Sequence, residues 1–424
     1  MEITLRPDYF SVDEKRLHEL SNMERKKYLQ KIKILKYVYE NEAATVSEIF
    51  TAVGISSPTC LILLSELIAE HVLEKKGKGE SMGGRKPDFY VLKDATFYIV
   101  SIDMEKFRTR AAILDNNNNY ITTIHTLSKG ISKDESAVAD LHLFINGMIT
   151  SSKIDKTKLV GIGISMPGLV DAERGTNYTY LKSDDKEKNL QEYLEAKFDY
   201  PVFLQNDVKC AAIAESKHGL AKGISDALVV LMDWGVGLGI IMDGKMRKGS
   251  RGFSGEIGHI PLMDEGALCY CGKKGCLETV ASGIALARMA KEGIKSGQHS
   301  LLNELSDHEI DKIEPHLVID AANRGDQYAI SILSIVGSNL GKGIATLVQL
   351  FNPEVIILGG KMAEAKQYIT IPIIQAINTY SMTEIRENTT IVTSGLGQDS
   401  CILGMASIVI NNILERQVRF GEAQ

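Results

Sequence analysis

The residues with the clearest chemical potential are three cysteines and a histidine in one short stretch of the chain. Cys269 and Cys271 are separated by a single residue, Cys276 follows on the same loop, and His259 lies shortly before them. Three thiolates and an imidazole are the usual ligands of a closed, tetrahedral, structural zinc site. A surface loop with reduced thiols is the alternative, but this clustering is far more specific than a lone pair of cysteines. The spacing therefore predicts bound Zn²⁺.

Two carboxylates lie close to these four residues. Glu256 is part of the segment Gly255-Glu256-Ile257-Gly258-His259, and Glu278 follows Cys276. A tetrahedral site is already complete with three cysteines and one histidine, so neither carboxylate is needed as a ligand. Their proximity indicates that a polar ligand is bound beside the metal.

The composition predicts a soluble globular protein with more than one domain. The chain has 424 residues, of which 44% are hydrophobic and 24% charged. That length exceeds one ordinary hydrophobic core, and the composition excludes a disordered chain. The formal net charge of −6 excludes a polybasic protein, although a local basic patch is compatible with it.

Cellular location is predicted from the cysteines and the apolar segments. The other cysteines stand singly among apolar neighbours, as is typical of reduced thiols in the cytoplasm. The N-terminus has no uninterrupted apolar core, so we expect no signal peptide. The longest apolar region, residues 330–351, is interrupted by polar residues, so we expect no membrane span.

The first part of the chain carries helix-turn-helix signals. An amphipathic helix is predicted over residues 27–40, and a second over 46–53, where Thr45 and Glu48 form a capping-box pattern. A turn at Gly54 leads to a third helix over 59–70. Two short strand-like runs within residues 71–92 then enclose a basic, glycine-rich loop. We predict a winged helix-turn-helix domain over residues 1–92.

This domain is expected to bind double-stranded DNA, with its third helix in the major groove and its wing on phosphates. The outward positions of the third helix include Ile62 and Leu63, and no Arg, Asn or Gln is available for bidentate base contacts. A winged helix that binds protein is the alternative. The candidate DNA contacts are Ser56, Ser57, Thr59, Lys75, Lys76, Arg85 and Lys86.

Residues 93–424 are predicted to form an α/β domain with a duplicated architecture. Strand-like runs are followed by a helix, and the same β-β-β-α order is then repeated, which suggests two lobes with a cleft between them. We expect lobe one to hold residues 93–205 and the C-terminal helix, and lobe two to hold about 206–395. The runs of the first repeat are 97–102, 110–114, 120–127, 134–151 and 159–165, and later runs include 202–204, 208–218, 227–232, 355–358 and 401–415.

Four motifs together resemble the ROK family of repressors, open reading frames and kinases. They are Ile164-Ser-x-Pro167-Gly168, Asn206-Asp207, Gly255-Glu256-x-Gly258-His259 and Cys269-x-Cys271-Gly-x-x-Gly-Cys276-x-Glu278. The resemblance implies a two-lobed, actin-like ATPase fold of the ribonuclease H-like type, a sugar in the cleft, and a homodimer or homotetramer. The N-terminal winged helix resembles the repressor branch.

The resemblance also implies roles for single residues. Asp207 matches the general base of the family's kinases, a role that a carboxylate at a strand-to-helix turn can fill. Asn206, Asp207, Glu256, His259 and Glu278 match sugar-binding positions. His259 would then bind zinc through one ring nitrogen and the sugar through the other. The alternative for Asn206 and Asp207 is simple capping of the helix that follows.

The phosphate-binding loops differ from those of active kinases. The family's kinases begin their first lobe with Asp-x-Gly-Gly-Thr, whereas this chain has Asp103-Met104-Glu105-Lys106-Phe107. Glu105 brings negative charge toward a polyphosphate, and Phe107 lacks the threonine hydroxyl. The second loop retains Gly235, Gly237 and Gly239, but Asp233 and Trp234 replace Gly-Thr. Both changes argue against use of ATP and Mg²⁺.

The sequence therefore predicts a cytoplasmic, sugar-responsive transcriptional regulator, with repression as the expected mode. A sugar or sugar phosphate would alter the closure of the lobes and so the binding of operator double-stranded DNA. An ATP-dependent sugar kinase with an appended DNA-binding domain is one alternative. A constitutive DNA-binding protein with a vestigial cleft is another.

Overall fold

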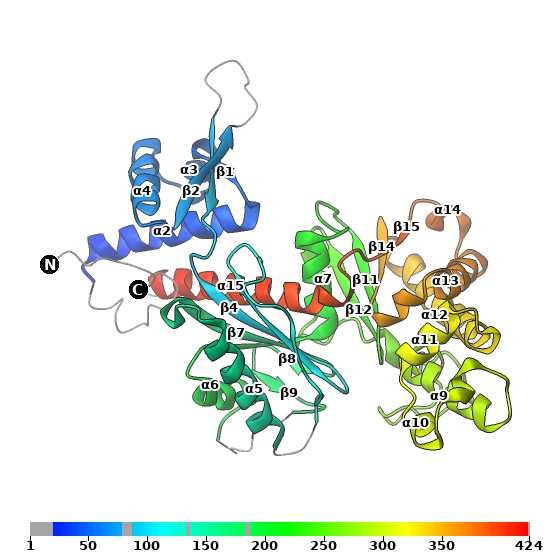
Figure 1. The fold of residues 1–424 in the computed structure, drawn as a ribbon. Helices are drawn as coiled ribbons and strands as arrows, with labels where there is room; N and C mark the ends of the chain where they lie inside the picture. Colours follow the sequence, from blue (N-terminus) through cyan, green and yellow to red (C-terminus); the bar gives the residue numbers. More distant parts are fainter. Residues whose placement is uncertain (1–19, 79–86, 133–135, 182, 184–186, 423–424) are drawn as a thin grey trace. The chain divides into compact units, whose positions relative to one another are not determined.

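The computed structural model describes residues 20–78, 87–132, 136–181, 183 and 187–422 (Figure 1). Two compact units are present. Unit 1 comprises residues 1–165, 180–204 and 405–424, and unit 2 comprises residues 166–179 and 205–404.

The N-terminal part of unit 1 is the predicted winged helix-turn-helix. Its helices are α2 (Asn22–Asn41), α3 (Val46–Val53) and α4 (Ser57–Ala69). Its sheet has the order β1-β3-β2, formed by β1 (Ala44–Thr45), β3 (Asp88–Leu92) and β2 (Leu73–Lys78). The hairpin β2–β3 is the wing.

Local capping determines where these helices begin. The Thr45 backbone N–H donates to Glu48 Oε2 at 2.7 Å, and the Glu48 N–H donates to the Thr45 hydroxyl at 3.4 Å. The predicted capping box is thus confirmed. Ser21 and Glu24 form the same arrangement at the start of α2. Each box satisfies amide groups that the first helical turn leaves without partners.

The rest of unit 1 is built on a five-stranded sheet of order β10-β7-β4-β5-β6. β4 pairs antiparallel with β5 and parallel with β7. The strands are β4 (Tyr98–Met104), β5 (Thr109–Asp115), β6 (His125–Leu127), β7 (Leu159–Met166) and β10 (Val202–Asn206), and the helical elements are α5 (Ser136–Ser152), η2 (Lys156–Lys158) and α6 (Leu190–Phe198).

The strand expected over residues 120–127 is shorter than predicted. Only His125–Leu127 forms a regular strand, β6. The backbone N–H of Ile113 donates to the Thr122 hydroxyl at 3.0 Å, and the Ile121 and Thr122 amides both point to Ile113 O. A side-chain oxygen thus replaces a carbonyl in the ladder, which ends regular pairing there.

Unit 2 contains a second five-stranded sheet, of order β13-β12-β11-β14-β15. Three consecutive antiparallel strands are followed by a strand that pairs parallel with the first of them, as in unit 1. This repetition agrees with the predicted duplication. The strands are β11 (Ala227–Met232), β12 (Val236–Met242), β13 (Lys245–Met246), β14 (Val355–Gly359) and β15 (Thr390–Thr393), with a separate hairpin of β8 (Val170–Asp171) and β9 (Thr176–Asn177).

Helices of unit 2 hold the ligand-binding candidates and a large hydrophobic core. α7 carries Asp207 at its first position, and α8 carries Glu278. The helical elements are α7 (Asp207–His218), η3 (Ile257–His259), α8 (Glu278–Ala281), α9 (Gly283–Lys295), η4 (Leu301–Glu304), α10 (Asp307–Asp311), α11 (Pro315–Asn323), α12 (Gln327–Phe351), η5 (Lys361–Ala365), α13 (Gln367–Tyr380), α14 (Thr383–Arg386) and η6 (Gly397–Asp399).

Among the described residues, α12 is long and apolar enough by itself to cross a membrane. Half of its most apolar window is buried inside the protein. Gly337 and Gly341 of α12 lie against α13. An added Cβ on Gly337 would lie 2.9 Å from Ile369 O, and one on Gly341 would lie 2.5 Å from Ile373 O. Because its buried side packs tightly on neighbouring elements, α12 is a core helix.

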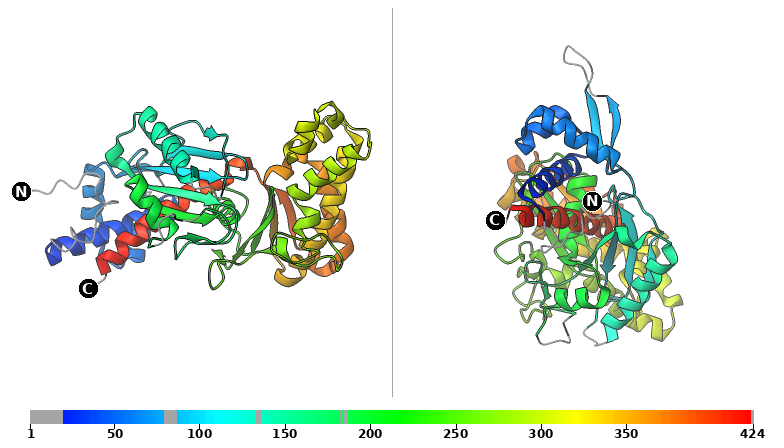
Figure 2. Two further views of the ribbon diagram at one scale, coloured as in Figure 1. Left: turned by 90° about the horizontal axis from the view of Figure 1, so that it is seen from below. Right: turned by 90° about the vertical axis from the view of Figure 1, so that its left-hand side faces the viewer.

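The last helix, α15 (Ser400–Glu422), supports the winged helix within unit 1. α2 and α15 lie side by side (Figure 2). The Tyr28 hydroxyl donates to the buried Gln417 Oε1 at 2.7 Å, and Arg25 Nη2 donates to Phe420 O at 3.2 Å. Lys33 forms an ion pair with Glu422 at 2.7 Å. α2 of the winged helix is therefore fixed to the C-terminal helix.

This contact predicts a measurable effect of Tyr28→Phe. The change removes the hydrogen bond to Gln417 in a buried position, so we expect a loss of about 1–2 kcal/mol in the free energy of unfolding. Urea unfolding followed by circular dichroism measures it. Tyr37→Phe on the same helix is the control and should change stability by less than about 0.5 kcal/mol. Equal effects of the two variants would contradict a specific role for the Tyr28 contact.

Candidate metal and ligand site

The four predicted metal ligands lie together in unit 2. The ligand atoms of His259, Cys269, Cys271 and Cys276 are all within 4.8 Å of one another. His259 Nδ1 lies 3.6 Å from Cys269 Sγ, and the sulfurs of Cys271 and Cys276 are also 3.6 Å apart. Ligands of a tetrahedral ion with bonds of about 2.0–2.3 Å stand about 3.3–3.8 Å from each other. This cluster can hold a metal ion.

Glycines shape the loop that carries the cysteines. Gly272 has φ of +88° and Gly275 has φ of +70°, values that favour glycine. A Cβ on Gly275 would lie 1.7 Å from Met263 O, so a side chain is excluded there. The Cys269 N–H donates to Lys273 O at 2.8 Å and closes the turn. The loop geometry is thus fixed by the backbone.

The second ring nitrogen of His259 has a protein partner. His259 Nε2 lies 3.0 Å from the Tyr270 hydroxyl, and the two rings meet edge to face. Such a contact fixes the orientation of a metal-binding imidazole. The family resemblance implies a sugar as the partner of this nitrogen. Tyr270 was not predicted as its partner, although its position between two cysteines was an available signal.

Asn206 and Asp207 mark the junction of β10 and α7. Asn206 makes no side-chain cap, and its Nδ2 donates to Gly168 O at 3.0 Å, which joins two of the predicted motifs. Its side chain is buried, and Oδ1 has no hydrogen-bond partner among the described residues. A buried acceptor without a donor is costly unless a ligand supplies one. Capping alone therefore does not account for Asn206.

The Asp207 carboxylate is shifted toward its protonated form. Burial raises its pKa to about 6, and the nearby negative charges of Asp233 and Glu256 act in the same direction. Its Oδ1 accepts from the Val208 backbone N–H at 2.8 Å, which opposes the shift. An acceptor with a pKa near neutrality is suited to hydrogen bonding with, or taking a proton from, a hydroxyl group.

Glu278 and Glu256 differ in their surroundings. Glu278 is only 7% exposed, burial raises its pKa to about 7, and Oε2 accepts from the Val236 N–H at 3.3 Å. Burial raises the pKa of Glu256 as well, against the positive charge of Lys209. Glu256 is exposed to solvent, so water screens its charge more strongly than that of the buried Glu278.

Lys209 is a further residue of this site that sequence reasoning missed. It is 3% exposed, and its ammonium group donates to Gly252 O. Burial lowers its pKa, while the charges of Glu256 and Asp207 raise it. Lys209 therefore ties the segment before Glu256 to α7. A lysine within the apolar start of α7 was the signal in the sequence.

The glycines of the second predicted phosphate loop serve packing in the structure. A Cβ on Gly235 would lie 2.5 Å from Glu278 Oε2, and one on Gly239 would lie 2.4 Å from the Ala212 Cβ. Gly237 faces Val208 in the same way, at 3.0 Å. These glycines let β12 approach α7 and Glu278 closely, so their presence alone does not indicate a phosphate site.

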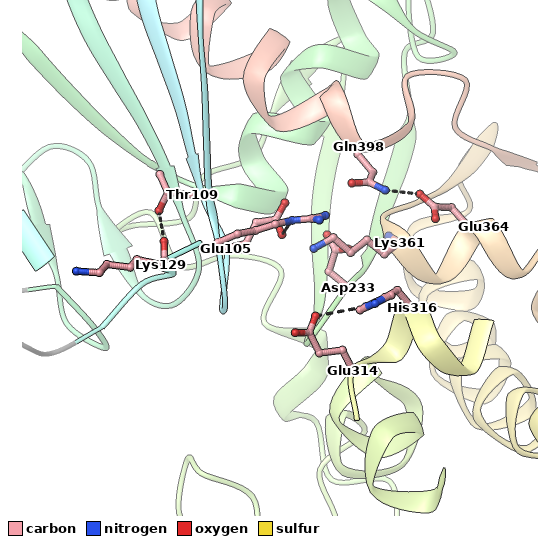
Figure 3. A network of polar contacts seen from close by, with 10 residues as sticks. Glu105, Thr109, Lys129, Asp233, Glu314, His316, Lys361, Glu364 and Gln398 are labelled. Carbon is pink, nitrogen blue, oxygen red and sulfur yellow. Dashed lines mark hydrogen bonds and ion pairs between the residues drawn. The ribbon is translucent and has the colours of Figure 1, made fainter. Parts of the chain in front are cut away.

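Asp233 puts a carboxylate next to backbone donors of unit 2. Its Oδ1 accepts from the Lys361 N–H at 2.7 Å, at the start of η5, and Asp233 lies beside Lys361 in Figure 3. The Asp233 and Trp234 carbonyls accept from Gly283 and Ile284 at the start of α9. Oxygens of Asp233 and Trp234 thus already accept from backbone amides at the starts of η5 and α9.

The first predicted phosphate loop, in unit 1, is the tight turn between β4 and β5. The Glu105 N–H donates to Arg108 O at 2.9 Å, and Arg108 Nε donates to Glu105 Oε2 at 2.9 Å. Asp103 is buried in β4, and Lys106 O occupies the space that a Cβ on Gly130 would need. The amide of Glu105 is therefore not available to a phosphate.

In the winged helix, α4 differs in one respect from the prediction. Leu63 is buried with Cys60, Leu64 and Leu67, so its assignment as an outward residue was wrong. Four residues on one helical stripe face the core together. Ile62 is 60% exposed, as predicted.

The predicted DNA contacts that the structure describes lie at the start of α4 and on the wing formed by β2 and β3. Ser56 caps α4 and pairs with the Thr59 hydroxyl at 2.7 Å, and Ser57 begins the helix. Lys75 forms an ion pair with Asp88 at 3.0 Å, while Lys76 is exposed. Arg85 and Lys86 lie outside the described residues.

Two family models match the chain. The model described as ROK family matches residues 99–412. The model described as winged helix-turn-helix DNA-binding matches residues 30–74. The two matches correspond to the two parts that the sequence predicted.

Curated relatives align with most of the chain. The chain is 30% identical over 392 residues to a xylose repressor of Caldicellulosiruptor bescii, covering 92% of this chain and 97% of the relative. It is 29% identical over 352 residues to the DNA-binding transcriptional dual regulator NagC of Escherichia coli, covering 82% and 85%.

Solved structures show the same fold. A ROK family transcriptional regulator described as a homolog of the Escherichia coli MLC protein aligns with a TM-score of 0.74, at 23% identity, over 93% of this chain and 99% of that one. A ROK family glucokinase from Streptomyces griseus, in complex with glucose and AMPPNP, aligns with a TM-score of 0.64, at 27% identity, over 73% and 98%. The actin-like sugar kinase fold is thereby confirmed for the larger part of the chain.

Proposed function

Because the chain belongs to the ROK family, we propose that it is a cytoplasmic, sugar-responsive transcriptional repressor of carbohydrate-utilisation genes. The observation that carries this proposal is the presence of a winged helix and a ROK domain in one chain, which aligns with a xylose repressor over 92% of its own length. The winged helix binds operator DNA, and a sugar bound in unit 2 changes the affinity for that DNA.

The proposed sugar site consists of groups that can hydrogen-bond several hydroxyls at once. Asn206 offers a buried, unpartnered carbonyl oxygen, and Asp207, Glu256 and Glu278 offer carboxylates. Sugar hydroxyls donate well to such acceptors. A ligand shifts DNA binding only by the difference in its affinity for the two states of the protein.

The metal in the cluster is Zn²⁺ in this proposal. Three sulfurs and one imidazole nitrogen at these separations suit zinc better than magnesium or calcium, which prefer oxygen ligands. All four positions are filled by protein, so the ion is structural. The ion would fix the positions of His259 and the neighbouring Glu278, and so the part of the sugar site that these two residues form.

The alternative is an active sugar kinase, which the likeness to a glucokinase and the retained Asp207 favour. Two carboxylates argue against kinase activity, because both place negative charge at the altered phosphate loops. Asp233 accepts a hydrogen bond from the Lys361 amide, and Glu105 pairs with Arg108. We expect no sugar-dependent release of ADP from wild-type protein in a coupled assay with ATP and Mg²⁺. Turnover that disappears in Asp207→Asn would establish the kinase instead.

A thermal-shift screen identifies the effector. A ligand that binds only the folded protein, present at about 100 times its Kd, stabilises it by about 2.7 kcal/mol. Free sugars and sugar phosphates are compared on the zinc-loaded protein. If no mono- or disaccharide, with or without phosphate, raises the melting temperature, the sugar-sensing part of the proposal fails.

A further inference from the structure

The outer side of α4, a helix that the structure describes in full, carries neither charges nor long hydrogen-bonding side chains. Its exposed residues recur at helical spacing on one stripe, opposite the stripe that packs into the core. Leu61 is 46% and Ile62 60% exposed, although both are large and apolar. The exposed residues of α4 are Pro58, Leu61, Ile62, Ser65 and Ala69. The surface that α4 offers to a partner is therefore almost wholly apolar.

The polar side chains of α3 and α4 are engaged within the domain. These two helices contain two charged residues, Glu48 and Glu66. Glu48 belongs to the capping box of α3, and Glu66 forms an ion pair with Lys31 at 2.9 Å. The Ser65 hydroxyl donates to Leu61 O of its own helix at 2.8 Å. Charge is therefore not the property by which α4 recognises a partner.

The position of α4 in the domain favours DNA as that partner. In a helix-turn-helix, the second helix of the motif lies in the major groove, and α4 holds that place after α3 and the turn at Gly54. The strand β2 of the wing packs against α4 and carries the exposed Lys76, which suits a phosphate. The wing thus supplies the positive charge that α4 lacks.

We propose that α4 reads operator DNA through the 5-methyl groups of thymine, with Leu61 and Ile62 as the residues that make the contact. The inference rests on the proposed function, because it requires that the winged helix binds an operator. It adds the base that is recognised. In the major groove, the edges of guanine, cytosine and adenine present hydrogen-bond donors and acceptors, whereas thymine also presents a methyl group. An aliphatic side chain can identify a base only through that methyl group.

The same contact disfavours the other bases. An aliphatic side chain packed on the amino group of cytosine or on the oxygen of guanine displaces water and supplies no hydrogen bond in exchange. On thymine, it removes an apolar methyl group from water instead. Burial of one such group changes affinity about fourfold. Thymine is therefore the base that Leu61 and Ile62 select.

The exposed stripe also has a suitable length and place on the helix. Leu61 and Ile62 lie in the N-terminal half of α4, the half whose residues contact base edges in a helix-turn-helix. From Pro58 to Ala69 the stripe extends about 16 Å at about 1.5 Å per residue, which is about the rise of five base pairs. Two adjacent aliphatic side chains can cover the methyl groups of neighbouring thymines. We therefore expect adjacent thymines in each half-site.

Replacement of thymine by deoxyuridine tests the proposal, because it removes the methyl group and leaves base pairing unchanged. Operator DNA is selected from a random duplex library with zinc-loaded wild-type protein, and each thymine is then replaced singly. Fluorescence anisotropy at one salt concentration measures the Kd. We expect at least one replacement to raise the Kd of the wild type about fourfold. The same replacement should have no effect in whichever variant, Leu61→Ala or Ile62→Ala, lacks the contacting side chain.

Leu143→Ala is the matched control for these variants. Leu143 is 72% exposed on α5, outside the winged helix, so its truncation removes an exposed aliphatic side chain without touching α4. It should keep the fourfold difference between thymine and deoxyuridine. Circular dichroism and zinc content check that all three variants are folded.

Two outcomes would overturn the proposal while the proposed function stands. One is a selected operator in which no deoxyuridine changes the Kd. The other is a replacement whose effect is the same in the wild type, Leu61→Ala and Ile62→Ala, which would assign the methyl group to the shape of the DNA. A wild type that selects no DNA sequence would overturn the proposed function as well, and would assign the apolar side of α4 to a protein partner.

Discussion

Cys276→Ser should release the metal ion and unfold the loop that leads into α8 and Glu278. Binding of structural zinc contributes about 10–16 kcal/mol in small zinc domains, so losing one thiolate ligand removes a large part of the stability of this segment. Cys276 is fully buried, and its neighbours Cys269 and Cys271 would be left with an incomplete ligand set. We expect zinc content to fall from about one ion per chain to near zero.

Mass spectrometry for zinc and thermal unfolding measure this prediction. Cys60→Ala is the control, because Cys60 is a buried thiol of α4 and is not part of the metal-ligand cluster found among the described residues. It should keep its zinc and lose no more than about 1 kcal/mol. A Cys276→Ser variant with full zinc occupancy would show that the four residues do not form one metal site.

Asp207→Asn should stabilise the protein while it weakens sugar binding. Folding raises the pKa of Asp207 to about 6, from an ordinary value of 3.8. The ionised carboxylate is therefore less favourable in the folded than in the unfolded state. The resulting loss of folding stability is absent below about pH 4, where Asp207 is protonated in both states. It grows as the pH rises to about 6. At pH 8 it reaches at most about 3 kcal/mol, because one pKa unit corresponds to about 1.4 kcal/mol.

Thermal unfolding between pH 4 and pH 8, with and without the sugar from the screen, separates the two effects. The asparagine variant should be more stable than wild type at pH 8 and equal to it at pH 4. A hydrogen bond to a charged group contributes about 1.5–3 kcal/mol, so sugar affinity should fall about 10- to 100-fold. Asp264→Asn, at an exposed position of unit 2, is the control. An unchanged sugar affinity would remove Asp207 from the site.

The features predicted correctly from sequence are those with local signals. The capping pair Thr45 and Glu48 determined a helix start, and the spacing of Cys269, Cys271 and Cys276 determined a ligand cluster. Each depends on a few residues close in sequence, whose geometry the backbone limits strongly. The duplicated architecture was predictable because the same succession of strands and helix occurs twice along the chain, whereas the order of strands within each sheet was not predicted.

The features that sequence reasoning missed depend on contacts between distant segments. Nothing near Asp233 in the sequence indicates that it accepts from the Lys361 amide, and nothing near Tyr28 indicates Gln417. The glycines of β12 resembled a phosphate loop until Val208, Ala212 and Glu278 were seen to fill the space beside them. Leu63 was assigned outward because its helix is apolar on most sides. Tertiary packing decided each of these cases.

The account's central claim is that a sugar in unit 2 controls DNA binding by the winged helix. The most direct measurement is fluorescence anisotropy of labelled operator DNA, drawn from the sequence upstream of the gene, titrated with zinc-loaded protein in the presence and absence of the sugar from the thermal screen. We expect the apparent Kd for operator to change at least 10-fold with sugar in wild type and to stay constant in Asp207→Asn. An operator affinity that is the same with and without a sugar known to bind the protein would contradict the claim.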